Sequence, residues 1–198
     1  MAKNMQPILK RCRTLGIEPS VMGVDKKSNR NPGGNQRKKK SEYAIQLNEK
    51  QKAKFIYGVL EKPFRKYFEM ANKREGITGE NLLSILESRL DNVIFRLGLA
   101  DTRRQARQIV THGHVLVNGK RVDIPSYLVS VGEVVSLKES VVNADWMKAI
   151  VERNSSRSVP SWISADKNTL SGTITAVAKR EDIDYEINET LIVELYSK

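Results

Sequence analysis

The chain has 198 residues, of which 39% are hydrophobic and 29% are charged, and its formal net charge at pH 7 is +11. This length allows one or two domains with modest cores, and no apolar run approaches the roughly 20 residues that span a bilayer. The first residues lack the apolar core of a signal peptide, and a single cysteine excludes an internal disulfide. We therefore expect a cytoplasmic protein.

The positive charge is concentrated in the first quarter of the chain. Residues 1–54 hold 14 Lys and Arg against 4 Asp and Glu, whereas residues 154–198 hold 5 against 7. Gly, Pro and Asn interrupt residues 1–42, which predicts turns and extended chain. Such a basic arm fits a segment that lies along RNA phosphates, and a solvated tail or a targeting signal is the alternative. The cations that we expect to bind RNA in this part of the chain are Lys10, Arg11, Arg13, Arg37, Lys38, Lys39, Lys40, Lys50, Lys52 and Lys54.

Three helices are predicted in the next segment. The first covers residues 47–57, with Asn48 as its N-cap. The second starts near Pro63, a residue that is acceptable in a first helical turn, and the third opens at Thr78. An aromatic stripe on the second helix could stack on bases, but at helical spacing we interpret it as core. The stripe consists of Phe64, Tyr67, Phe68 and Ala71.

Two short helices are predicted in residues 89–111. The first carries an apolar stripe and ends where Gly98 can form a left-handed cap. The second begins with a capping box made by Thr102 and Gln105. Opposite its apolar residues we expect an arginine face that binds RNA phosphates, the alternative being a solvated face. Its members are Arg103, Arg104 and Arg107.

A small antiparallel sheet is predicted after residue 113. Asn118-Gly119 is a strong signal for a two-residue type I′ hairpin, because both turn residues need positive φ. Further strands are expected at 127–129 and 133–137. A basic hairpin beside an arginine helix favours RNA binding over a merely solvated surface. The hairpin residues that we expect to contact RNA are His114, Asn118, Gly119, Lys120 and Arg121.

Several motifs in this region resemble the S-four-type RNA-binding domain. They are residues 88–93 (SRLDNV), 103–107 (RRQAR), 112–114 (HGH) and 117–119 (VNG). The resemblance continues through residues 43–52, the Ile77-Thr78-Gly79 turn and the final residues 188–198. Over nearly its full length the chain is similar to the bacterial-type S-four family of small-subunit ribosomal proteins.

The resemblance implies a structural protein that assembles early on the 5′ domain of the small-subunit ribosomal RNA (rRNA) and influences translational accuracy. It also implies contact with neighbouring small-subunit proteins, including the S-five type, and a place near the path by which mRNA enters. Many relatives bind zinc in the N-terminal arm through four cysteine-type ligands. Because this arm keeps only Cys12 and has no histidine, we expect no zinc site and no other cofactor.

The expected fold is α+β, with a small RNA-binding domain inserted into a mainly helical one. Residues 1–42 form the basic extended arm, 43–88 and 154–198 the mainly helical domain, and 89–153 the inserted domain of two helices and a short antiparallel sheet. A helix is expected at 143–153 and extended segments near 161–163 and 173–177. Residues 188–197 fit a helix or a strand; we favour a helix that packs on residues 47–88.

Catalytic constellations are missing from the sequence. The two histidines, His112 and His114, have no nearby Ser or Cys to activate, and the acidic residues between 181 and 189 lack the spacing of a metal site. We predict a structural RNA-binding protein of the small ribosomal subunit, not an enzyme. The alternatives are an RNA-modifying enzyme with this small domain appended, which would need a catalytic domain, and a free regulator that binds mRNA or tRNA through the same surface.

Overall fold

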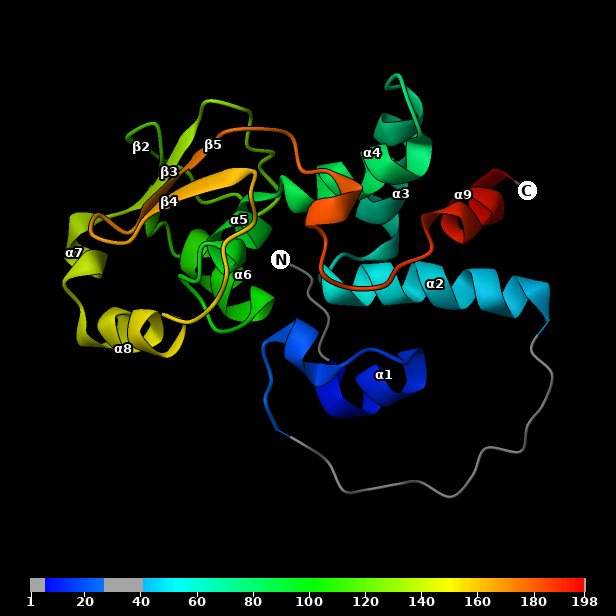
Figure 1. Ribbon diagram of the computed structural model, residues 1–198, viewed down its shortest axis with the longest axis horizontal. Helices are drawn as coiled ribbons and strands as arrows, with labels where there is room; N and C mark the ends of the chain where they lie inside the picture. Colours follow the sequence, from blue (N-terminus) through cyan, green and yellow to red (C-terminus); the bar gives the residue numbers. More distant parts are fainter. Residues whose placement is uncertain (1–5, 27–40, 198) are drawn as a thin grey trace. The chain divides into compact units, whose positions relative to one another are not determined.

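The computed structural model describes residues 6–26 and 41–197, which fall into two compact units (Figure 1). The first unit comprises the chain up to Asn81 together with residues from Tyr185 onward, and the second comprises Leu82–Asp184. Helices form most of the first unit, and the second combines helices with an antiparallel sheet. The predicted α+β class is confirmed. Four cations of the predicted arm lie outside the described residues: Arg37, Lys38, Lys39 and Lys40.

The first unit is built from helices. Helix α4 (Thr78–Glu87) crosses the boundary, so its first turn belongs to this unit and its remainder to the second. The other helices are α1 (Ile8–Leu15), the 3-10 helix η1 (Pro19–Met22), α2 (Glu42–Ile56), α3 (Glu61–Asn72) and α9 (Glu189–Ser197).

The N-terminal segment is folded where the sequence analysis expected extended chain. Cys12 and Leu15, three residues apart on α1, are 0% and 4% exposed, and Ile17 and Met22 are also buried. The helix ends at Gly16, whose φ of 69° is the left-handed cap conformation that glycine adopts without a Cβ penalty. The prediction of extended chain is therefore wrong for residues 8–22, because four well-placed apolar side chains suffice to hold them.

Helix α2 begins earlier than the sequence pattern indicated. The Oγ of Ser41 accepts a hydrogen bond from the Ala44 N–H at 3.3 Å, so Ser41 is the N-cap and Asn48 lies inside the helix. The prediction of Asn48 as cap is wrong. In α3, by contrast, Phe64 and Tyr67 are buried, which confirms that the aromatic stripe is core.

The C-terminal segment is helical and packs on the first unit, as favoured from the sequence. Helix α9 runs beside α2 in Figure 1, and the Gln46 side-chain amide donates to a Glu194 carboxylate oxygen at 3.0 Å. The rings of Phe68 and Tyr196 stack with centroids 4.6 Å apart. The start of α9 also approaches α4 closely, because a Cβ on Gly79 would overlap the side chain of Glu189.

The second unit contains the five-stranded sheet. Its strands are all antiparallel and lie in the order β2-β1-β3-β5-β4. The strands are β1 (Val115–Val117), β2 (Lys120–Arg121), β3 (Val134–Leu137), β4 (Ile163–Asp166) and β5 (Ser171–Ile174). The helices are α5 (Leu90–Arg96), α6 (Arg103–Thr111), α7 (Glu139–Val142), α8 (Asp145–Arg153) and the 3-10 helix η2 (Arg180–Asp182).

One face of the sheet forms the core of this unit. Val115, Val117, Val135 and Leu137 alternate with outward residues and are 0–5% exposed. They pack with the apolar residues of α5 and α6, which lie against the sheet in Figure 1. The predicted ends of these helices are confirmed, because Gly98 has φ 75° after α5 and the Thr102 hydroxyl accepts from the Gln105 N–H at 3.2 Å.

The sheet extends beyond the segment that the sequence analysis gave to the inserted domain. Residues 163–174 were assigned to the helical domain, yet they supply β4 and β5, and β5 pairs directly with β3 through Val135 and Gly172. The second unit therefore runs to Asp184 instead of residue 153. The strand predicted at 127–129 is only a single bridge between Leu128 and Arg89.

Candidate RNA-binding surface

Several arginines of the second unit are buried instead of facing solvent. Arg89, Arg96 and Arg103 are 2%, 7% and 6% exposed. A buried guanidinium is tolerated only where carboxylates or other acceptors replace its water. These residues are therefore part of the framework that holds the surface.

Asp91 joins two of the arginines at the start of α5. Arg89 binds it through two parallel contacts, Nε to Oδ1 at 3.0 Å and Nη2 to Oδ2 at 2.6 Å. Arg107 reaches the same carboxylate from α6, with Nη1 3.3 Å from Oδ2. Arg107 thus ties α6 to α5 and offers only part of its side chain to the surface, where it is 23% exposed.

A second network links Glu87 to the helices. The guanidinium of Arg96 donates from Nε and Nη2 to the two carboxylate oxygens of Glu87, both at 3.0 Å. Asn92 donates to Glu87 at 2.7 Å and accepts from Arg103 Nε at 2.8 Å. The Arg103 guanidinium also lies 4.3 Å from the ring centroid of Phe95.

The prediction that Arg103 belongs to an exposed arginine face is therefore wrong. Arg103 precedes Ala106 by three residues and Val110 by seven, which places it on the buried stripe of α6. Arg104, one residue on, is exposed. Of the three predicted arginines, Arg104 is the one that α6 presents to solvent, with Arg107 at the edge.

The predicted hairpin turn is confirmed. Asn118 and Gly119 have φ of 48° and 77°, and the Asn118 side-chain oxygen accepts from the Val134 N–H at 2.8 Å. Lys120 and Arg121 follow and are both exposed. Because successive side chains of a strand point to opposite faces, these two cations serve opposite faces of the sheet.

Three polar residues share the face of the sheet that points away from the core. Arg121 stands opposite Leu116, on the face that also carries His114 two residues earlier. The carbonyl of His114 accepts from the Lys138 N–H at 2.9 Å, which brings Lys138 alongside. The guanidinium of Arg121 lies over Gly113, where a Cβ would overlap it.

Aromatic rings adjoin these cations. The ring of His114 lies 5.8 Å from that of His112 and 6.2 Å from that of Trp146, centroid to centroid. Burial lowers the pKa of the His114 imidazole, and the charges of His112, Lys138 and Arg121 lower it further. We call this set the aromatic–basic surface; it comprises His112, His114, Arg121, Lys138 and Trp146.

Sequence reasoning missed Trp146 and Lys138. Both lie more than 20 residues from His114 in the chain, and no motif links them to it. Their proximity comes from the pairing of β1 with β3 and from the turn of chain through α7 into α8.

The lysines predicted on α2 are largely occupied by acidic partners. Lys50 and Lys54 bind Glu61 at 3.0 and 2.7 Å, and Lys52 lies 3.7 Å from Glu49. Partial burial would raise the pKa of Glu61, but hydrogen bonds from Lys54, Lys50 and Tyr196 outweigh it and lower the pKa to about 2. Lys50 and Lys54 therefore stabilise the packing of α2 with α3 and α9, whereas Lys52 pairs within α2.

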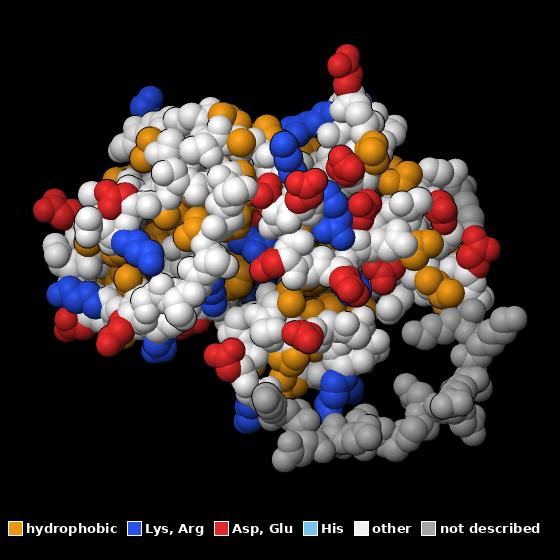
Figure 2. Space-filling view, viewed as in Figure 1, with side chains coloured by type: hydrophobic (Ala, Val, Ile, Leu, Met, Phe, Trp, Pro, Cys, Tyr) orange, Lys and Arg blue, Asp and Glu red, His pale blue; other side chains and the backbone are white. Residues whose placement is uncertain are grey.

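The other predicted cations lie on α1, where Lys10 and Arg13 are exposed and Arg11 is partly buried. On the face shown in Figure 2, basic and acidic side chains are interspersed. Charge alone does not mark an RNA site in that view.

Within residues 6–26 and 41–197, no three His, Cys, Asp or Glu side chains gather in a way that could hold a metal ion. Cys12 is buried, and burial raises the pKa of its thiol. None of the helices in these ranges has the length and apolar character that a membrane crossing requires.

Comparison with known proteins agrees with this geometry. The family model for the S4 domain matches residues 88–135, which hold α5, α6, β1 and β2, and the model for the ribosomal protein S4/S9 N-terminal domain matches residues 3–87. The chain is 60% identical to small ribosomal subunit protein uS4 of Agathobacter rectalis, 59% to that of Lachnoclostridium phytofermentans and 52% to that of Fusobacterium nucleatum, each over the full length of both chains. The chain therefore belongs to the family of small ribosomal subunit protein uS4.

Proposed function

We propose that this protein is a structural, RNA-binding constituent of the small ribosomal subunit. The observation that carries the proposal is its identity of 50–60% with uS4 proteins over entire chains. The family is structural, so the alternative of an RNA-modifying enzyme with an appended domain is set aside. The chain binds ribosomal RNA and works among other ribosomal proteins.

Recognition of RNA rests on phosphates and shape. The deep groove of A-form RNA admits few side chains, so a protein reads a folded junction mainly through its backbone. Arg104, Lys120 and Arg121 are exposed cations held by a helix and a hairpin of the second unit. We propose that they bind phosphates of the 5′ domain of the small-subunit rRNA, where the protein assembles early.

Further roles are proposed on the family resemblance. We propose contact with a neighbouring protein of the S5 type, a place near the path by which mRNA enters the subunit, and an influence on the accuracy of decoding. Lys10, Arg11 and Arg13 on α1, with the basic segment that follows, would bind neighbouring RNA.

The test is binding of the intact protein to 5′-domain rRNA and to an equal amount of unrelated structured RNA across a range of salt. We expect tight, selective binding with a steep salt dependence, because each phosphate contact releases counterions. Replacing Arg104, Lys120 and Arg121 together by Gln should weaken binding and flatten the slope. Arg65→Gln is the control, since Arg65 is a 71% exposed arginine on α3.

Equal binding to both RNAs would contradict the proposal. The protein would then bind RNA only through its net charge of +11, or it would be a free regulator of another RNA. Selective binding with an unchanged salt slope in the triple variant would contradict only the assignment of these three residues.

A further inference from the structure

We propose that Trp146, with His114 and His112, forms a stacking site for an unpaired RNA base, whose phosphates bind Arg121 and Lys138. This inference rests on the proposed RNA-binding function and adds to it. Phosphate contacts form with single-stranded and double-stranded RNA alike, whereas a stacking site binds only a base that is unpaired and unstacked.

The exposure of Trp146 is the first argument. Its side chain is 45% exposed, whereas Trp162, the other tryptophan, is 2% exposed. An indole that only filled the core would be covered like Trp162. The ring planes of Trp146 and His114 are inclined by 48°, and those of His114 and His112 by 74°. The rings therefore do not cover one another face to face, and part of the indole surface stays accessible.

The rings are held by rigid elements, which is the second argument. Trp146 is the second residue of α8, and that helix is anchored by Met147 and Ile150, which are 0% and 2% exposed. His112 is the C-cap of α6, and His114 leads directly into β1. A base that binds here meets a preformed platform, so little conformational entropy is lost on binding.

The charge around the rings is the third argument. Arg121 and Lys138 lie close enough to His114 to act on its ring: burial lowers the pKa of this imidazole most, and the positive charges of His112, Lys138 and Arg121 lower it further. The imidazole ring offers a face on which a base can stack, and the neighbouring cations suit phosphates. Three acidic residues lie close in sequence to these cations. Asp123 pairs with Arg121 at 3.9 Å in an exposed contact, a type of pair that contributes little. Glu139 and Asp145 stand in the first turns of α7 and α8, where a carboxylate stabilises the helix start.

Aromatic rings flanked by cations favour RNA over a protein side chain as the occupant. Single-stranded nucleic acid is bound by this combination, in which aromatic groups stack on bases and a positive surface follows the backbone. An apolar protein partner would gain nothing from Arg121 and Lys138, whose charges it would have to desolvate. Binding of a protein at Trp146, in place of RNA, would therefore contradict the proposal.

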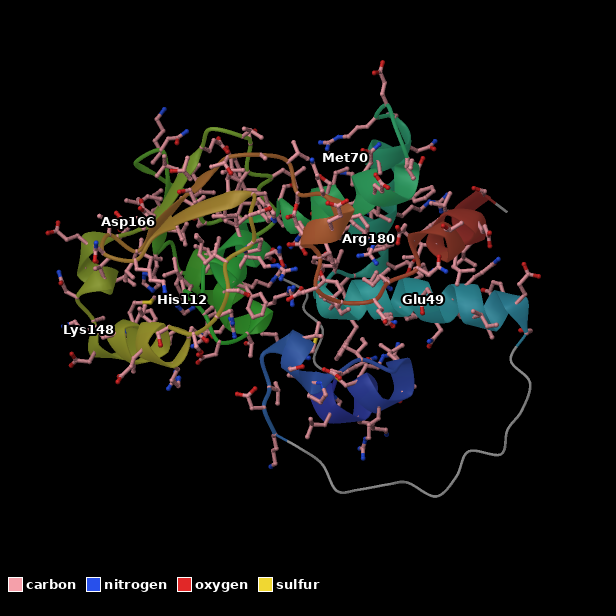
Figure 3. The ribbon with its side chains drawn as sticks, viewed as in Figure 1. Glu49, Met70, His112, Lys148, Asp166 and Arg180 are labelled. Carbon is pink, nitrogen blue, oxygen red and sulfur yellow. The ribbon has the colours of Figure 1, made fainter. Side chains whose placement is uncertain are left out.

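Helix α8 supplies a matched control. Lys148 is exposed and lies two residues from Trp146, so it points to a different side of the helix. In Figure 3 His112 is labelled beside α8, and Lys148 is labelled further out on the same helix. Lys148→Gln removes a charge from α8 without touching the rings.

The first experiment reads the indole directly. In a Trp162→Phe variant all tryptophan fluorescence comes from Trp146. We expect quenching by an RNA hairpin that carries an unpaired loop, and much less by a blunt duplex of the same stem at equal occupancy. Where Trp162→Phe does not fold, the unaltered protein is used with 2-aminopurine in the loop of the hairpin. Equal signals from loop and duplex would overturn the proposal.

The second experiment measures affinity for 5′-domain rRNA. Trp146→Leu should weaken binding by about 5- to 150-fold, the range of one stacked base, while Trp146→Phe keeps most of the affinity and Lys148→Gln loses little. The salt slope should stay unchanged in Trp146→Leu, because no phosphate contact is lost. Unchanged affinity in Trp146→Leu, with selective salt-dependent binding intact, would overturn the stacking site and leave the proposed function standing. Loss of selectivity in the unaltered protein would instead contradict the proposed function.

Discussion

The guanidinium of Arg121 lies across Gly113, in the space that a Cβ at that position would fill. Gly113 also has φ 68°, a conformation that side chains rarely adopt. One residue thus ends α6 and leaves room for a cation that the hairpin presents. The end of α6 and the position of Arg121 therefore both depend on the absence of a Cβ at Gly113.

Replacing Gly113 by Ala should therefore have two effects. The left-handed backbone costs about 1–2 kcal/mol for a residue with a Cβ, and the new methyl group displaces Arg121. We expect lower stability in urea and weaker binding to 5′-domain rRNA. Gly132→Ala is the control, because Gly132 has φ 89° and open space around it. If both variants bind RNA equally well when folded, the packing of Arg121 on Gly113 has no role in binding.

Arg103 and Arg104 should separate stability from RNA binding. Arg103→Gln breaks the hydrogen bond to Asn92 and the contact with Phe95, so it should lower the free energy of unfolding. Arg104→Gln, at an exposed position, should leave stability almost unchanged and reduce the salt slope of RNA binding by about 1. Thermal unfolding and salt titration of both variants check this, and a stable Arg103→Gln protein with a flattened slope would reverse the assignment.

Asp91→Asn should destabilise the second unit. The substitution leaves Arg89 buried without its carboxylate and releases Arg107 from α5. Breaking a buried ion pair in this way costs about 3–5 kcal/mol, which urea unfolding would show as a lower midpoint. The control is Asp123→Asn, because Asp123 and Arg121 form an exposed pair at 3.9 Å. Equal midpoints for the two variants would contradict a structural role for Asp91.

The ion pairs of Glu61 should make the first unit sensitive to acid. The pKa of this carboxyl is lowered from 4.5 to about 2 in the folded protein. Because the folded value lies below the unfolded one, the contribution is complete above about pH 4.5 and is lost as the pH falls towards 2. Unfolding of the unaltered protein and of Glu61→Gln, measured from pH 6 to pH 2, should show a difference that shrinks over this interval.

Glu69→Gln provides the comparison for that pH series. Glu69 is 60% exposed and lies 3.5 Å from Arg65, which is 71% exposed, and a surface pair of this type contributes little to stability. Its difference from the unaltered protein should be small at every pH. A pH-independent effect of Glu61→Gln would show that the carboxyl acts through packing and not through charge.

Local signals in the sequence predicted the parts of the fold that depend on local chemistry. The Asn118-Gly119 turn and the Thr102 cap are each decided within four residues, and both are present. The helix favoured for the last segment is also present, and it packs on α2.

Features that depend on distant residues were not predicted. Strands β4 and β5 join the sheet only through pairing with β3, which the local pattern does not encode. The three arginines of α6 were predicted to share one face because residues three and four apart are neighbours. Arg103 has the same kind of spacing to Ala106 and Val110, and it lies with them on the buried stripe. Trp146 reaches His114 through tertiary packing alone.

The order of the strands sets when the protein can finish folding during its own synthesis. Residues 88–135 match the S4 domain, but β3 stays an open edge until β5, some 35 residues later, pairs with it. The first unit forms later still, since α9, the last of the helices in the described residues, packs on α2. Until β5 and α9 are added, the nascent chain carries an unpaired strand edge and a helix that lacks its neighbour, two surfaces on which wrong partners associate.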